Sequence, residues 1–221
     1  IRVLRAAGYD VFAPKPAAGR PYCCGRTYLS AGMVDKARAE AERLVTALYP
    51  LARSGVRIVG LEPSCTLALR DEVPALLGTA QAEAVAEATL TFAELIEADR
   101  PDLPVPAAAA RRPVKLHGHC HQKAFDLVKP AEAVLRDIAG AEVEVIETSC
   151  CGMAGAFGYG RDTYDVSIRM AEASLLPAVR AAPNDAAIVA DGTSCRCQID
   201  DGTGREVVHL ARHLDRLISG S

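Results

Sequence analysis

The residues of this chain whose type and spacing could do chemistry are its eight cysteines. Two Cys-Cys-Gly triplets begin at Cys23 and Cys150, and each is followed later by a Ser-Cys, at Cys65 and Cys195. Thiolates are soft ligands that bind iron-sulfur clusters, zinc or copper(I). A chain of 221 residues that is 50% hydrophobic can bury a core without disulfides, so the cysteines are not needed as cross-links.

The second half of the chain holds a fuller set of thiols than the first. These thiols are spread over three loops and lack the compact CxxC…CxxC spacing of a zinc knuckle, which favours an iron-sulfur cluster, with zinc as a substitute metal. Neighbouring cysteines reach one centre only if the backbone bends sharply, and Gly152 allows that bend. The predicted metal ligands are Cys120, Cys150, Cys151, Cys195 and Cys197 in the second half and Cys23, Cys24 and Cys65 in the first.

The cysteines keep their register across an internal repeat. Ile58-Val59 followed by Ser64-Cys65 matches Ile188-Val189 followed by Ser194-Cys195 at a constant offset of 130 residues. We therefore predict two copies of one unit, over residues 1–99 and 114–221, joined by a linker over residues 100–113 that is rich in proline and alanine. The first copy is expected to lack its start, because its counterpart of Cys120 would lie before residue 1.

Apolar runs and helical periodicity alternate along both copies. Strands are expected at 9–13, 56–61, 114–117, 142–146 and 186–190, and helices at 34–48, 81–98, 130–139, 162–180 and 206–218, with Pro50 closing the first. This alternation indicates an α/β fold in which each unit has a parallel sheet flanked by helices, duplicated about a pseudo-twofold axis. The cysteines then follow strands, at the carboxyl edge where open parallel sheets bind ligands.

Composition excludes several classes of function. A net charge of -3 and an aromatic content of 5% leave no basic or stacking surface for nucleic acid. The chain has no apolar run of about 18 residues and no signal peptide, so we expect a cytoplasmic protein without a membrane span. Any association with a membrane would run through its partners.

Histidines stand near some of the cysteines. Three of them alternate around Cys120 and are not expected to share a face: His117, His119 and His121. His209 and His213 stand four residues apart on the last expected helix, a spacing that suits a metal pair. Without a neighbouring Glu motif, a solvated helix face is the expectation there.

The motifs resemble the cysteine-rich CCG domain of heterodisulfide reductase B subunits, glycolate oxidase iron-sulfur subunits and lactate-utilisation proteins. More narrowly, the chain resembles the carboxyl-terminal iron-sulfur domain of FAD-linked oxidases related to D-lactate and D-2-hydroxyglutarate dehydrogenases. The resemblance covers nearly the whole chain and rests on GLEPSC at 60–65, HGHCH at 117–121, SCCGMAG at 149–155, YDVS at 164–167 and DGTSCR at 191–196.

This resemblance implies a 4Fe-4S-type cluster, electrons arriving from FAD in an upstream domain or flavoprotein subunit, and a 2-hydroxy acid as their source. The electron acceptor stays open, and substrate oxidation is not expected in this segment alone. Gly152, Lys123 and Arg196 are predicted to lie around the cluster. The spacing Cys195-Arg196-Cys197 departs from the CxxC common in the family, so Cys197 is either a ligand or a bystander.

Two other classes of protein could use the same thiols. A zinc-binding structural or docking module would hold a metal without redox activity. A thiol-disulfide catalyst of the heterodisulfide type would cycle Cys150 and Cys151 through a disulfide. Both alternatives remain open from the sequence.

Overall fold

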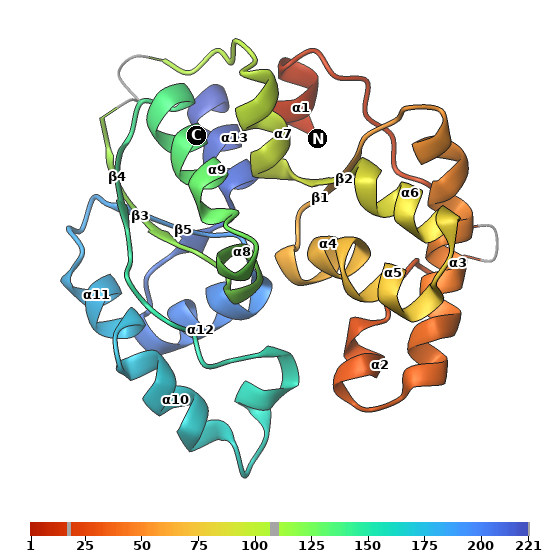
Figure 1. Cartoon of the computed structure of the whole chain (residues 1–221). Coiled ribbons are helices and arrows are strands. Elements are labelled where there is room, and N and C mark those ends of the chain that lie inside the picture. The colour runs from red at the N-terminus through yellow and green to blue at the C-terminus, as the bar shows by residue number, and fades with distance from the viewer. Residues whose placement is uncertain (17–18, 107–110, 221) are drawn as a thin grey trace. The chain divides into compact units, whose positions relative to one another are not determined.

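A computed structural model describes residues 1–16, 19–106 and 111–220 (Figure 1). The chain divides into two compact units. The N-terminal unit is Val11–Leu95, and the C-terminal unit combines Ile1–Asp10 with Ile96–Ser221. The predicted boundaries at 99 and 114 stay a prediction, and residues 107–110 of the predicted linker lie outside the described residues.

The C-terminal unit is built on a parallel sheet with the strand order β4-β3-β5-β6. Its strands are β3 (Pro113–His117), β4 (Glu142–Val145), β5 (Ala187–Ala190) and β6 (Val207–Val208). In the register of β3 with β5, His117 lies beside Ala190, so both strands end at the same edge. The loops that carry the cysteines of this unit leave from that edge.

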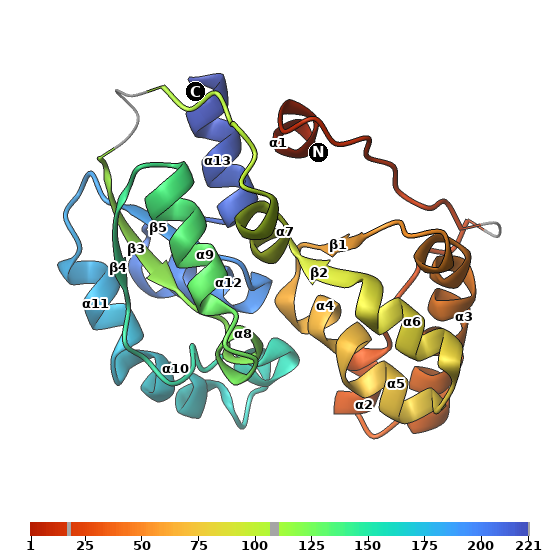
Figure 2. The same cartoon turned by 45° about the horizontal axis from the view of Figure 1, so that its top comes forward.

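Helices cover both faces of this sheet: Figures 1 and 2 show α9 and α13 on one side, and α11 and α12 on the other. The buried side of α11 and α12 contributes Leu175, Val179 and Ile199 to the core, against Ile188 of β5. The helical segments of the unit are α1 (Arg2–Ala6), α8 (Cys120–Ala124), α9 (Val128–Ala133), the π-helix η1 (Val134–Ile138), the 3-10 helix η2 (Gly155–Tyr159), α10 (Tyr164–Glu172), α11 (Leu175–Ala181), α12 (Thr193–Thr203) and α13 (Leu210–Ser219).

The N-terminal unit has a smaller parallel sheet, in which β1 (Ile58–Gly60) pairs with β2 (Thr89–Thr91). Its core is formed by the apolar face of the long helix α3, including Ala41, Leu44 and Val45. The helices of this part of the chain are α2 (Arg26–Ser30), α3 (Val34–Arg53), α4 (Pro63–Arg70), α5 (Glu72–Leu77), α6 (Ala80–Ala88) and α7 (Phe92–Asp99), which continues into the C-terminal unit.

The predicted α/β class with parallel sheets and flanking helices is confirmed. The predicted strand at 9–13 is wrong, because these residues form a connection that is not paired in either described sheet. Ahead of it, α1 packs against α13, which places the start of the chain in the C-terminal unit. Among the described residues, no helix combines the length and the apolar character needed to cross a membrane.

Several predicted helices have different limits in the structure. The helix expected to close at Pro50 continues to Arg53, because proline removes a single N–H and the apolar face of α3 persists. The helix expected at 81–98 is interrupted by β2, whose backbone pairs with β1. The helix expected at 162–180 breaks between α10 and α11, and the one expected from 206 begins at Leu210, after β6. A short strand or a break between helices thus lies within each of these three stretches, although their sequences have helical periodicity.

Candidate metal centre

The two Cys-Cys-Gly triplets fold into the same tight turn. Gly25 and Gly152 have φ angles of 80° and 86°, a left-handed conformation that favours glycine. Their N–H groups donate to the sulfur of the first cysteine, at 3.4 Å for Cys23 and 3.3 Å for Cys150. The bend that sequence reasoning assigned to Gly152 is therefore present in both units.

Close packing on a helix explains why each of these residues is glycine. A Cβ added at Gly152 would lie 2.2 Å from the carbonyl oxygen of Ser167, and one at Gly25 would lie 2.8 Å from that of Ala37. Ser167 is the fourth residue of α10, and Ala37 is the fourth residue of α3. Each turn is thus pressed against the first turns of a helix further along the chain, α10 in one unit and α3 in the other.

The remaining predicted ligands stand at the start of helices that follow strands. Cys65 and Cys195 are each the third residue of their helix, α4 after β1 and α12 after β5. Cys120 is the first residue of α8, which follows β3. Sequence reasoning expected Cys195 in a loop, whereas the structure places it in the first helical turn. This turn fixes the direction of its side chain more firmly than a loop would.

In the C-terminal unit, four thiols form a continuous chain of side-chain contacts. Cys120 hydrogen-bonds with Cys150, Cys150 with Cys151, and Cys151 with Cys195. Cys151 and Cys195 are buried, Cys150 is half-buried and Cys120 is exposed. Three segments that follow strands of one sheet therefore bring four free thiols together, two from the starts of helices and two from a turn, with Cys120 open to solvent.

Electrostatics divide these four thiols into two kinds. Hydrogen bonding from Cys120 lowers the pKa of Cys150, and hydrogen bonding from Cys151 lowers the pKa of Cys195. The same hydrogen bonds raise the pKa of Cys120 and of Cys151. A thiol that donates its proton to a neighbouring thiolate releases that proton less readily. Four adjacent thiolates repel one another. A bound cationic metal would remove that repulsion, so this donor set fits a soft metal or a cluster.

The N-terminal unit brings together fewer thiols. Cys24 is buried and hydrogen-bonds with Cys65, which lowers the pKa of Cys24 and raises that of Cys65. Cys23 lies near enough to Cys65 to raise the pKa of Cys65 further by charge repulsion. All three predicted ligands of this unit are therefore neighbours.

Cys197 has a different neighbour from the other predicted ligands. It stands two residues after Cys195 on α12, and side chains two apart on a helix do not share a face. Its thiol hydrogen-bonds with the hydroxyl of Tyr159, an interaction that raises the pKa of the tyrosine. The structure therefore places Cys197 with Tyr159 of η2, and its role as a ligand stays a prediction.

The histidines around Cys120 are arranged differently from the expectation. The rings of His119 and His121 are stacked, with centroids 5.1 Å apart, because the side chain of His119 folds back and its Nδ1 accepts the N–H of His121 at 3.2 Å. His119, Cys120 and His121 offer ligand atoms within 4.8 Å of one another. His117 is 1% exposed and hydrogen-bonds with Cys195, which helps to lower the pKa of that thiol.

The two basic residues predicted near the cluster bind backbone carbonyl groups of the cysteine loops. The ammonium group of Lys123 donates to the carbonyl oxygens of Thr148 and Ser149, just before Cys150. Burial lowers its pKa, although the nearby thiols act in the opposite direction. Arg196 donates to the carbonyls of Ala190 and Asp191 at the end of β5. Both cations therefore hold the loops that carry cysteines.

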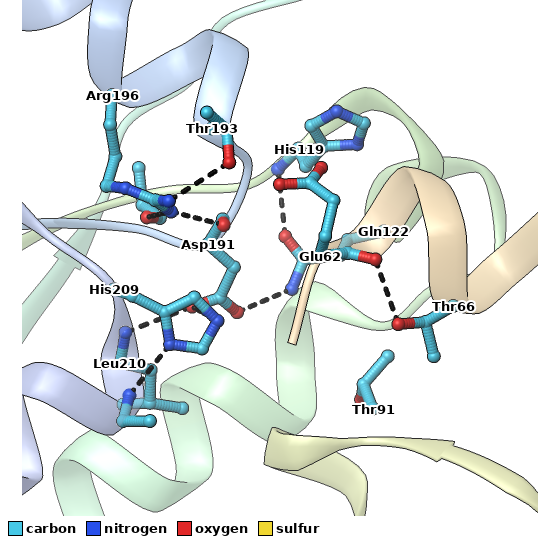
Figure 3. A network of polar contacts seen from close by, with 12 residues as sticks. Glu62, Thr66, Thr91, His119, Gln122, Asp191, Thr193, Arg196, His209 and Leu210 are labelled. Atoms are coloured by element: carbon cyan, nitrogen blue, oxygen red, sulfur yellow. Dashed lines mark hydrogen bonds and ion pairs between the residues drawn. The ribbon is translucent and has the colours of Figure 1, made fainter. Parts of the chain in front are cut away.

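Sequence reasoning missed a buried polar network beside the thiols, shown in Figure 3. At its centre is Asp191, which follows β5 directly and accepts hydrogen bonds from Gln122 Nε2 at 2.9 Å and from the N–H of Leu210 at 3.0 Å. His209 Nε2 lies 3.4 Å from the same carboxylate. The position of Asp191 in the sequence could have identified it. An acidic residue directly after a predicted strand lies at the sheet edge where the cysteines gather.

This network corrects the expectation for His209 and His213. His209 precedes α13 as its cap, and His213 is buried, so the two do not form a solvated helix face. The N–H of Ala211 donates to Nδ1 of His209 at 2.9 Å. The sequence analysis placed both histidines on one helix because it began that helix at residue 206. In the structure β6 occupies Val207–Val208 and α13 begins at Leu210, after His209.

Comparison with known proteins finds a family model that matches part of the C-terminal unit. Residues 114–200 match the model of the CCG family, the cysteine-rich domain. This part of the chain is similar to the cysteine-rich domains of that family. The predicted resemblance is confirmed, and the matched residues include the four thiols that the structure brings together.

A longer stretch of the chain, which includes this matched segment, is similar to two kinds of dehydrogenase. It is 27% identical over 212 residues to a subunit of the anaerobic glycerol-3-phosphate dehydrogenase of Escherichia coli (strain K12), covering 95% of this chain and 52% of that protein. It is 29% identical over 189 residues to D-2-hydroxyglutarate dehydrogenase of the same organism, covering 85% of this chain and 18% of that protein. The corresponding Pseudomonas putida protein is 30% identical over 212 residues, covering 95% and 19%. The chain thus spans about half the length of the first relative and about a fifth of the others.

Proposed function

We propose that the C-terminal unit is the electron-transfer domain of a flavin-linked 2-hydroxy acid oxidoreductase. In this proposal Cys120, Cys150, Cys151 and Cys195 hold a 4Fe-4S-type cluster. The observation that carries the proposal is the convergence of four free thiols from three segments that follow strands of one sheet. A set of four thiolates is the usual protein ligand set of such clusters.

The protein side chains supply position and environment. When bound, the cluster stores single electrons between a two-electron flavin and an acceptor. Burial of Cys151 and Cys195 keeps water from one side, whereas the exposed Cys120 marks the side open to a partner. Lys123 lies near all four thiols, and its positive charge favours a more reduced, more anionic centre.

The relatives support the choice of oxidoreductase. Two kinds of dehydrogenase match almost the whole chain, one as a subunit and the other as a much longer protein. Both names describe oxidation of a substrate that carries a hydroxyl group, and D-2-hydroxyglutarate is a 2-hydroxy acid. We propose that FAD and the substrate site lie in an upstream domain or in a flavoprotein subunit, and that the whole assembly works in the reducing cytoplasm.

A zinc module is the second candidate, and a specific observation favours it. His119, Cys120 and His121 offer three ligand atoms within 4.8 Å of one another, which suits a single tetrahedral ion. This site shares Cys120 with the thiol chain. A single ion would therefore compete with a cluster for the same cysteine.

Anaerobic purification of the full chain, supplied with iron and sulfide, separates the two candidates. We expect a brown protein with iron, acid-labile sulfide and broad visible absorption that bleaches on reduction. Cys120→Ser should lose both iron and sulfide, and His121→Ala should retain them. A colourless protein with stoichiometric zinc that depends on His121 would overturn the proposal.

A further inference from the structure

Two consecutive residues after β5 contact the helix that begins with Cys120. The buried carboxylate of Asp191 accepts a hydrogen bond at 2.9 Å from Gln122, a side chain that is 2% exposed. The other end of that amide accepts the N–H of His119 at 3.0 Å. The residue after Asp191 is Gly192, and a Cβ added there would lie 2.3 Å from Cδ2 of the His119 ring. The ring therefore packs directly against the backbone of Gly192.

The carboxylate of Asp191 also connects to α13. The N–H of Leu210 donates to its Oδ1 at 3.0 Å, and Nε2 of His209 lies 3.4 Å from the same oxygen. Because Nδ1 of His209 accepts the N–H of Ala211, the ring hydrogen of the neutral histidine is on Nε2 and points to Asp191. Both oxygens of one buried carboxylate are thus occupied by groups from α8 and from the start of α13 (Figure 3).

Cys120 stands between His119 and Gln122, the two residues that contact Gly192 and Asp191. Cys120 is exposed and stands on α8, a helix of five residues, which is too short to be stable alone. Cys195, by contrast, is buried four residues after Asp191. Contacts from α8 to Asp191 and Gly192 therefore fix the distance between the two outer thiols of the chain.

We infer that Asp191 is a positioning residue that holds the Cys120 helix against the β5–α12 junction, so that Cys120 and Cys195 are set for one metal centre before it binds. The inference deepens the proposed function and rests on it for its effect on metal. Groups that orient metal ligands typically change metal affinity by about 10–100-fold when they are removed.

Iron retention in the full chain tests this role. The variants are Asp191→Asn and Gln122→Met, with Glu40→Gln as the matched control, because Glu40 is also a buried carboxylate that is ion-paired but belongs to the N-terminal unit. Each reconstituted protein is challenged with an iron chelator under anaerobic conditions. We expect both test variants to lose iron about tenfold faster or more, and Glu40→Gln to match the wild type.

The double variant provides a readout that a purely structural role would not move. If both residues act through their shared hydrogen bond, the combined loss should be close to that of either single variant. Additive losses, or unchanged iron retention in both single variants, would overturn the inference. Should Asp191→Asn fail to fold, Gln122→Met, which keeps the carboxylate and its bonds to α13, carries the test.

Hydrogen exchange in the metal-free protein separates this inference from the proposed function. We expect residues 118–125 to exchange faster in Asp191→Asn and Gln122→Met than in the wild type, with α10 unchanged. If the wild type binds no iron but this local change occurs, the proposed function fails and the positioning role stands. If iron binds and exchange over 118–125 is unchanged, the positioning role is wrong.

Discussion

In both units the glycine of the Cys-Cys-Gly triplet lies against the carbonyl of the fourth residue of a later helix, Ala37 of α3 in one and Ser167 of α10 in the other. In both, its N–H donates to the sulfur of the first cysteine, and the later cysteine is the third residue of a helix after a strand. The triplet turn is therefore shared. It does not decide how many thiols meet.

The surroundings of the two turns differ. The C-terminal unit adds Cys120 and the carboxylate of Asp191, whereas the position equivalent to Asp191 in the N-terminal unit is Leu61, which is 54% exposed. The start of α7 is capped locally, by Thr91 and Glu94 bonding to each other's N–H groups. The start of α13 is capped locally by His209 and is also bound to Asp191, which lies after a different strand. A complete thiol set thus occurs together with contacts that join separate strand ends.

The largest expected effect concerns the equivalent cysteines Cys195 and Cys65. Cys195→Ser should abolish most of the iron bound by the chain, because a hydroxyl is a harder and far weaker ligand than a thiolate. Cys65→Ser should cost much less iron, since its unit brings together three thiols. Iron and sulfide analysis of the two reconstituted variants checks this. Equal losses would show that the N-terminal unit also contributes to metal binding.

The second prediction compares the two glycines. Gly152→Ala should lower the free energy of unfolding of the C-terminal unit by about 3 kcal/mol, from left-handed strain plus overlap with Ser167. At Gly25 an added Cβ would lie 2.8 Å from the carbonyl oxygen of Ala37, further than the 2.2 Å at Gly152. Gly25→Ala should therefore lower the free energy of unfolding of its unit by less. Denaturant unfolding followed by hydrogen exchange assigns each loss to a unit. Gly204→Ala, with a similar φ of 64° and open space around it, is the control and should cost about 1 kcal/mol.

The third prediction uses pH, because the N-terminal unit contains no histidine. Burial, helped by the charges of Arg216 and Arg112, lowers the pKa of His213 from 6.5 to about 4. In the unfolded chain His213 therefore binds a proton near pH 6.5, whereas in the folded unit it binds one only near pH 4. Stability present above pH 6.5 is lost as the pH falls towards 4, by on the order of 2 kcal/mol.

Urea unfolding at pH 7 and pH 5 measures this loss in the C-terminal unit. His213→Gln should flatten the pH dependence, because glutamine does not titrate. An equally steep dependence in the variant would mean that other groups, such as carboxylates, account for the loss.

The smallest expected effect concerns Cys197. Its thiol bonds with Tyr159, so Cys197→Ser should leave the iron and sulfide content close to that of the wild type. Cys120→Ser is the contrasting variant, since it removes one end of the thiol chain. Loss of iron in Cys197→Ser comparable to that in Cys120→Ser would place Cys197 among the ligands.

The longer strands of the C-terminal unit were predictable. The expected strands at 114–117, 142–146 and 186–190 correspond to β3, β4 and β5. β2 and β6 were not predicted, because two or three residues carry too little periodicity to stand out from the helices beside them. The first turn of α12 was predicted to be a loop for a similar reason, since its polar residues show no apolar stripe.

The sequence alone identified the eight cysteines, their internal repeat, the glycine that permits adjacent thiols to turn together, and the sheet edge where they gather. These features depend on residue type and on local geometry. Only the tertiary structure decided that Cys120, Cys150, Cys151 and Cys195 meet while Cys197 faces Tyr159. It alone also revealed the link from Asp191 to Gln122, because that contact joins residues 69 positions apart, and its formation depends on how separate strands and helices pack.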